Sequence, residues 1–119
     1  MSTRERLARV AGRWNGVLTH YGRKTGKPYE VTIWFVVDRE TIYLTTMNMK
    51  RQWTRNVQKN PKVSLAVGGE TFEGRISSLT APGEIARVVE LLKAKYWITR
   101  PYFWFRSAPD GAFRLDLGK

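Results

Sequence analysis

The feature that most constrains the fold is the segment YEVTIWFVV at residues 29–37, the strongest strand-forming stretch of the chain. β-Branched and aromatic residues dominate it, and successive side chains along a strand point to opposite faces. One face would carry Tyr29, Val31, Ile33, Phe35 and Val37, and the other would carry Glu30, Thr32, Trp34 and Val36. Because both faces hold apolar residues, this strand is too apolar to belong to an open sheet with a solvent-exposed face.

Five further segments read as strands, and three show the apolar spacing of helices. The expected strands are residues 13–20, 29–37, 41–46, 62–67, 71–78 and 111–117, and the expected helices are residues 3–12, 52–60 and 82–99. Glycine and proline turns join neighbouring strands as antiparallel hairpins, whereas a parallel sheet would need helices between its strands. We therefore predict a mainly β fold with helices, built as a small six-stranded antiparallel barrel.

The order of these elements predicts one domain over residues 1–119, a length that suits a single hydrophobic core. The N-terminal helix would span 3–12, the barrel 13–79 and 111–117, and the long helix 82–99. No stretch approaches the roughly 20 apolar residues of a membrane-spanning helix, and the N-terminus lacks the apolar core of a signal peptide. We expect a cytoplasmic protein with no membrane partner.

The chain is strongly basic, with 21 Lys and Arg against 10 Asp and Glu and a net charge of +11. Such an imbalance predicts an acidic partner and says nothing about the fold. It contains no cysteine and one histidine, so disulfides and the usual zinc sites are excluded. No paired carboxylates or nucleophile motif is recognisable either, and we expect no metal site. If the protein is an enzyme, a cofactor should carry the chemistry.

The positive charge is concentrated in residues 45–69, TTMNMKRQWTRNVQKNPKVSLAVGG, which hold five cations and no carboxylate. One interpretation is a solvated basic helix whose Trp53 packs inward. The other is an anion site, because a strand end with hydroxyl and amide donors is followed by cations at a helix start. The residues that would form this site are Thr45, Thr46, Asn48, Lys50 and Arg51.

Two further segments allow both a structural and a functional interpretation. The turn GRKTGKP at residues 22–28 lacks the spacing of a phosphate-binding P-loop. It is either a solvent-exposed turn or a turn that places Arg23 and Lys24 beside a bound anion. The aromatic residues near the end of the long helix suit a core or a dimer contact, or the wall of a pocket for a flat substrate. The pocket candidates are Trp34, Tyr96 and Tyr102.

The segments LTHYGRKTGKPYEVTIWFVV and YLTTMNMKRQWTRNVQKNPKVSLAVGG together resemble the split β-barrel flavin and deazaflavin oxidoreductases. This superfamily includes pyridoxamine phosphate oxidase-like proteins and deazaflavin-dependent nitroreductases. The nitroreductase branch commonly has GRKTG after the first strand and W-x-x-N-(L/V)-x-x-N-P before a later one. Here these motifs are residues 22–26, and Trp53, Asn56, Val57, Asn60 and Pro61.

The resemblance implies a six-stranded split barrel, a homodimer, and a deazaflavin of the coenzyme F420 type or FMN bound in a groove near the subunit interface. The cofactor-binding positions that it implies are Arg23, Lys24, Thr45, Thr46, Asn48, Lys50, Arg51, Trp53 and Asn56. The implied activity is hydride transfer between the cofactor and a small organic substrate, a reductase reaction. The alternatives are a basic barrel that binds nucleic acid, which the two-sided apolar strand disfavours, and a cofactor carrier without turnover.

Overall fold

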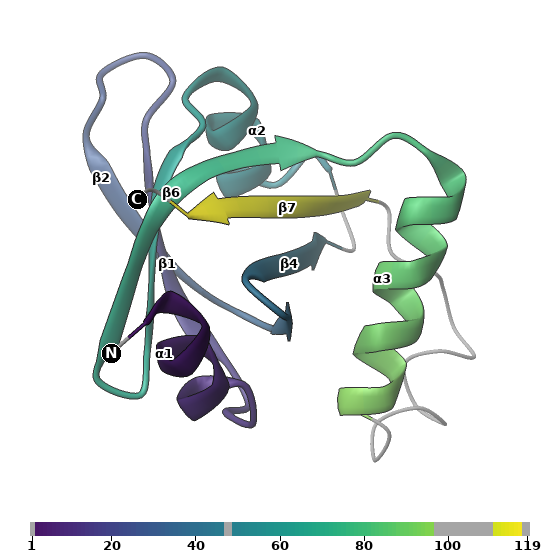
Figure 1. Ribbon diagram of the computed structural model, residues 1–119. Coiled ribbons are helices and arrows are strands. Elements are labelled where there is room, and N and C mark those ends of the chain that lie inside the picture. Colours follow the sequence, from purple (N-terminus) through teal and green to yellow (C-terminus); the bar gives the residue numbers. More distant parts are fainter. Residues whose placement is uncertain (1, 47–48, 97–110, 118–119) are drawn as a thin grey trace.

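The computed structural model describes residues 2–46, 49–96 and 111–117. These residues form three helices and seven strands (Figure 1). In order they are α1 (Thr3–Val10), β1 (Gly16–Tyr21), β2 (Pro28–Ile33), β3 (Phe35–Asp38), β4 (Thr41–Thr46), α2 (Gln52–Lys59), β5 (Lys62–Val67), β6 (Glu70–Ser78), α3 (Pro82–Lys95) and β7 (Gly111–Leu117).

The seven strands form one sheet in the order β2-β1-β5-β6-β7-β4-β3, in which every pair is antiparallel. The two edge strands, β2 and β3, are consecutive in the chain and are separated by Trp34 alone. A sheet whose opposite edges are joined by one residue has to curl. The result is an open, split barrel with a seam between β2 and β3, which come close to each other only around Trp34.

The predicted strand at residues 29–37 is therefore two strands, and the predicted count of six is wrong by one. Ile33 still pairs with Gly16 of β1, but Phe35 pairs with Leu44 of β4. Both halves are strand-forming, so local preference cannot reveal a change of pairing partner between them. At the junction the Trp34 ring stacks on Tyr96, with the ring centroids 4.2 Å apart and the planes 6° from parallel.

The hydrophobic residues form two clusters, one on each side of the sheet. The larger fills the barrel and includes Leu7 of α1 and Val57 of α2 among the inward residues of the strands. The smaller lies between α3 and the outer face, where Val36 of β3 packs with Val88 and Leu92. Figure 1 shows the consequence: α1 and α2 lie at opposite ends of the barrel, and α3 lies along its side.

Local sequence explains most element boundaries. Gly68 and Gly69 have φ angles of 53° and 86°, the left-handed conformations that a tight two-residue hairpin between β5 and β6 requires. Ser2 and Glu5 form a capping box at the start of α1, which ends at Val10, two residues before the predicted limit. Pro82 begins α3 as predicted; the last part of its predicted range, residues 97–99, lies outside the described residues.

In the part of the chain that the structure describes, no helix is long and apolar enough to cross a membrane.

Candidate functional site

A cavity of about 260 Å³ lies where the β1–β2 turn meets α2. The turn contributes two cations, Arg23 and Lys24, and the lining contains no carboxylate. Gln52, the first residue of α2, lines the cavity, so the start of the helix lies at it. The side chain of Arg51, the N-cap residue, forms no capping hydrogen bond there. Unpaired N–H groups and the helix dipole favour an anion at such a helix start. The complete lining is Gly22, Arg23, Lys24, Thr25, Tyr29, Gln52 and Asn56.

Asn56 of α2 holds Arg23 in this cavity. Its Oδ1 accepts the backbone N–H of Arg23 at 3.2 Å and a guanidinium N–H of the same residue at 2.7 Å. Its Nδ2 lies 3.1 Å from Nδ1 of His20 on β1. Asn56 is fully buried; its bond with His20 is buried as well, and its two bonds with Arg23 are partly buried. One buried amide thus joins the helix, the first strand and the basic turn.

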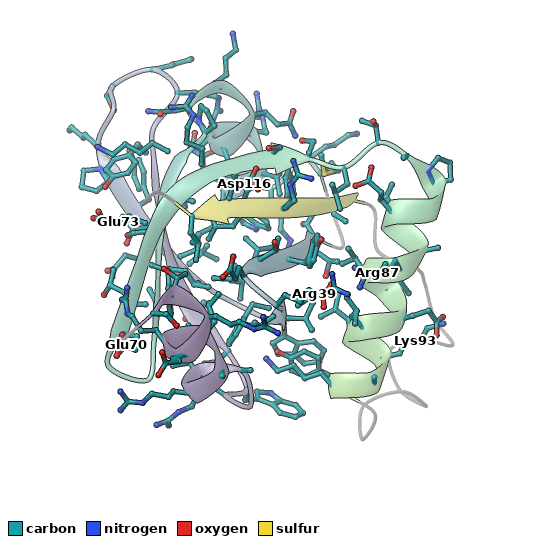
Figure 2. The ribbon with its side chains drawn as sticks, viewed as in Figure 1. Arg39, Glu70, Glu73, Arg87, Lys93 and Asp116 are labelled. Carbon is teal, nitrogen blue, oxygen red and sulfur yellow. The ribbon has the colours of Figure 1, made fainter. Side chains whose placement is uncertain are left out.

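A second cavity, of about 490 Å³, lies between the β3–β4 turn and α3. Figure 2 shows Arg39 and Arg87, two of its residues, close together beside α3. Its lining holds three arginines but also two carboxylates, and Arg87 already binds Asp38 at 2.6 Å. Because its charges are nearly balanced, this cavity is a poorer anion site than the carboxylate-free cavity at α2. The residues that line it are Arg4, Asp38, Arg39, Glu40, Thr41, Tyr43 and Arg87.

The other predicted cofactor-binding residues differ in their exposure and lie outside the α2 cavity or outside the described residues. Thr45 and Thr46 end β4, where Thr46 is buried, and Lys50 and Arg51 lie exposed just before α2. None of these four lines the α2 cavity. Asn48 lies outside the described residues.

Trp53 is a core residue. It is 5% exposed and packs against Phe113 of β7, with ring centroids 5.4 Å apart. This packing agrees with the interpretation in which Trp53 points inward from a basic helix. Its contribution to the site is to fix α2 on the barrel.

The predicted substrate-pocket residues do not lie at this cavity. Trp34 and Tyr96 stack at the β2–β3 junction, where the half-exposed Trp14 packs edge-on against both. The β1–β2 ladder runs from the Tyr21–Pro28 pair beside the basic turn to the Gly16–Ile33 pair beside Trp34. Five residues of strand separate these ends, or about 16 Å. Tyr102, the third candidate, lies outside the described residues.

Tyr96 is fully buried and its hydroxyl is already bonded, so it anchors the end of α3 to the chain around β1 and β3. The hydroxyl donates to the Trp14 carbonyl at 2.7 Å and accepts the Phe35 N–H at 3.3 Å. Burial raises the pKa of Tyr96 to about 12 and lowers the pKa of the neighbouring Lys95 to about 8. The Lys95 ammonium also donates to the Phe35 carbonyl at 2.8 Å and lies 3.6 Å from the Phe35 ring centre.

Sequence reasoning overlooked Tyr29 and Gln52, which line the α2 cavity, and His20, which contacts Asn56 behind it. His20 had seemed unable to form a metal or nucleophile site, and no group of His, Cys, Asp or Glu among the described residues is suited to hold a metal. The signal for it was positional, because Gly16, Leu18 and His20 are the inward residues of β1. Tyr29 stacks over the His20 ring, with centroids 5.8 Å apart, and is 43% exposed.

Comparisons with known proteins agree with this architecture. A model of the family "F420H(2)-dependent quinone reductase" matches residues 1–99. No curated protein matches the chain. Many solved structures share the fold at low sequence identity, and three of them that are covered over most of their length serve as examples.

A candidate pyridoxamine 5′-phosphate oxidase from Listeria innocua is 18% identical with a TM-score of 0.76, covering 98% of this chain and 94% of its own. An F420-H2-dependent reductase, FDR-A, is 19% identical with a TM-score of 0.70, covering 87% of this chain and 95% of its own. An FAD-binding protein from Mesorhizobium loti is 19% identical with a TM-score of 0.75, covering 100% of this chain and 90% of its own. These likenesses confirm the predicted split-barrel fold.

Proposed function

The chain belongs to the F420H(2)-dependent quinone reductase family, and from that premise we propose that it reduces a small organic acceptor, of the quinone class, with a bound deazaflavin. The observation that carries the proposal is the carboxylate-free cavity at α2, in which a buried amide holds Arg23. The bound deazaflavin would supply the hydride. The chain itself would bind, orient and neutralise charge.

The residues of the α2 cavity fit the acidic part of such a cofactor. Arg23 uses one guanidinium N–H on Asn56, and its fork geometry leaves further donors for an oxyanion. Lys24 adds a second charge and Thr25 a hydroxyl. Because Asn56 already fixes the Arg23 side chain, less conformational entropy is lost when an anion binds.

The aromatic residues at the other end of the β1–β2 ladder fit the flat ring system of the deazaflavin. Trp34 is partly buried and Trp14 is half exposed, so their rings offer apolar surface beside the barrel seam. Anion-binding groups and aromatic rings about 16 Å apart on one ladder suit an elongated molecule with an acidic tail and a ring system. In this arrangement, Trp34 would help to orient the ring and the acceptor.

A deazaflavin of the coenzyme F420 type fits the charge better than FMN does. Its tail is a string of glutamates, whereas FMN ends in one phosphate. The exposed face of α2 continues the basic surface beyond the cavity with Arg55 and Lys59. Several carboxylates spread along this face would each find a nearby cation, and this favours the deazaflavin.

Replacing Arg23 or Lys24 by alanine should raise the Kd for the deazaflavin by about tenfold to a hundredfold, since each change removes a charge-assisted hydrogen bond. The measurement is a fluorescence titration of the pure protein with the deazaflavin and with FMN in parallel, at physiological salt. Arg75→Ala is the matched control, because Arg75 is exposed on β6, does not line the cavity, and its loss changes the net charge equally.

Arg75→Ala should change the Kd less than about twofold. If all three variants weaken binding to the same extent, the ligand is held by attraction to the net positive charge of the protein and not by the cavity. Tighter binding of FMN than of the deazaflavin would contradict the choice of cofactor. Oxidation of the reduced deazaflavin by a soluble quinone, followed by absorbance, then separates a reductase from a carrier that binds without turnover.

We also propose that the protein is a homodimer. The edge strand β2 is the least covered strand of the described sheet: Ile33 is its only buried residue and Tyr29 is prominently exposed. A partner subunit on this strand would cover that surface next to the cavity. Analytical ultracentrifugation should give twice the chain mass of 13.8 kDa. A monomer at micromolar concentration would contradict this assembly.

A further inference from the structure

His20 is a buried histidine to which the proposed reaction assigns no part. Its side chain faces the barrel interior from β1 and is 3% exposed. Among its neighbours are the Asn56 amide, whose Nδ2 lies 3.1 Å from Nδ1 of His20, and the stacked ring of Tyr29. A buried polar ring beside a ligand cavity needs a specific hydrogen-bonding role.

The hydrogen bonds of Asn56 determine which form of His20 is present. Asn56 Oδ1 accepts two N–H groups from Arg23, so the oxygen of the amide must face the turn. The NH₂ group then faces His20, and it can only donate. His20 Nδ1 must therefore accept, which requires a neutral ring with its proton on Nε2.

We propose that His20 is a positioning residue that makes anion binding at the α2 cavity depend on pH. The neutral ring holds the Asn56 amide in the orientation that holds Arg23 in the cavity. Protonation of Nδ1 sets an N–H against the N–H of Asn56, so the amide must turn or withdraw, and Arg23 loses its acceptor. This inference rests on the proposed function of the cavity, but its first link, the pairing of His20 with Asn56, does not.

The surroundings of His20 keep it neutral near pH 7. Burial lowers its pKa below the ordinary value of 6.5. Of the groups that face it, Tyr29 from β2 and Asn56 from α2 contribute no carboxylate, and Arg23 from the turn is a cation that opposes a second positive charge. The cations of the packed elements α2 and β5 are exposed: Arg55, Lys59 and Lys62.

The sign of the pH effect follows from the lowered pKa. Above about pH 6.5 the ring is neutral in both the folded and the unfolded chain, and the full network is present. As the pH falls through the folded pKa, the ring is protonated and the network is lost. Anion binding should therefore weaken on the acidic side, by up to about tenfold for each pH unit below that pKa.

The test compares deazaflavin binding from pH 7.5 to pH 5 in the wild type, His20→Gln and His20→Leu. The glutamine side chain can offer an acceptor oxygen without titrating, and leucine offers none. We expect the wild-type Kd to rise about tenfold across the range, His20→Gln to stay near the neutral wild-type value, and His20→Leu to bind weakly throughout. Groups of the ligand titrate equally in all three proteins, so the ratio of wild type to His20→Gln isolates the histidine.

If His20→Gln loses as much affinity for the deazaflavin at acidic pH as the wild type does, the proposal is overturned. A second measurement needs no ligand. In ¹⁵N NMR at pH 7.5, Nδ1 of His20 should be unprotonated and Nε2 protonated. The Arg23 guanidinium signal should shift when His20 titrates. A proton on Nδ1 at pH 7.5 would also overturn it. If the expected NMR pattern appears but no deazaflavin binds at any pH, the proposed function fails while the pairing of His20 with Asn56 stands.

Discussion

Replacing Tyr96 by alanine should lower the free energy of unfolding by about 4 kcal/mol, the range for deleting a large buried aromatic side chain. Tyr96 is fully buried and stacks on Trp34 at the one-residue junction between the edge strands. Its hydroxyl also bonds the Trp14 carbonyl, so it links α3 to the chain segment just before β1. Losing it would remove packing between the helix and the seam of the barrel. Urea denaturation followed by circular dichroism measures the change.

Tyr96→Phe divides this effect into its two parts. Phenylalanine keeps the stacking but leaves the Phe35 N–H and the Trp14 carbonyl without their partner, which should cost about 1–3 kcal/mol. If phenylalanine costs as much as alanine, the hydroxyl and not the ring is the anchor. If neither variant changes stability by more than about 0.5 kcal/mol, α3 does not depend on Tyr96 for its position.

Gly74→Ala should destabilise the protein by about 3 kcal/mol, because a methyl group there cannot fit between two strands. Gly74 lies in β6 opposite Leu117 of β7, and a Cβ atom at this position would overlap the backbone oxygen of Asp116. Backbone cannot rotate away as a flexible side chain can, so β6 and β7 would have to separate. The same denaturation experiment reports the loss, and a large fall in thermal midpoint should accompany it.

Gly83→Ala is the matched control for this substitution. Gly83 lies in the first turn of α3 with no neighbour within 4 Å of an added Cβ. Alanine there should raise stability by about 0.5–1 kcal/mol, because it restricts the unfolded chain and favours the helix. A Gly74→Ala variant as stable as the wild type would mean that β6 and β7 are farther apart than the structure shows.

Local sequence patterns predicted most of the fold. Alternating side chains marked the strands, and Gly68–Gly69 and Pro82 marked a hairpin and a helix start. The break at Trp34 could not be predicted this way, because residues 29–37 are uniformly strand-forming and only the distant partners, β1 and β4, differ. The pairing of β7 between β6 and β4 has the same origin: it depends on contacts that no local window contains.

The candidate site was predictable in part. Family-like motifs pointed to Arg23, Lys24 and Asn56, which the structure brings to one cavity. The motifs did not distinguish ligand contact from scaffold, since Trp53 shares the helix with Asn56 but faces the core. His20 was missed because its role depends on the amide of Asn56, which lies 36 residues away in the sequence.

The place of β7 in the sheet has a consequence for how the protein is made. It lies between β6 and β4, so a nascent chain that stops before residue 111 holds two separate pieces, β2-β1-β5-β6 and β4-β3, each with an open edge. On the ribosome the sheet can close only after residues 111–117 emerge. Until then, β6 and β4 present unpaired N–H and C=O groups to any strand nearby, the situation in which chaperones protect nascent chains from aggregation.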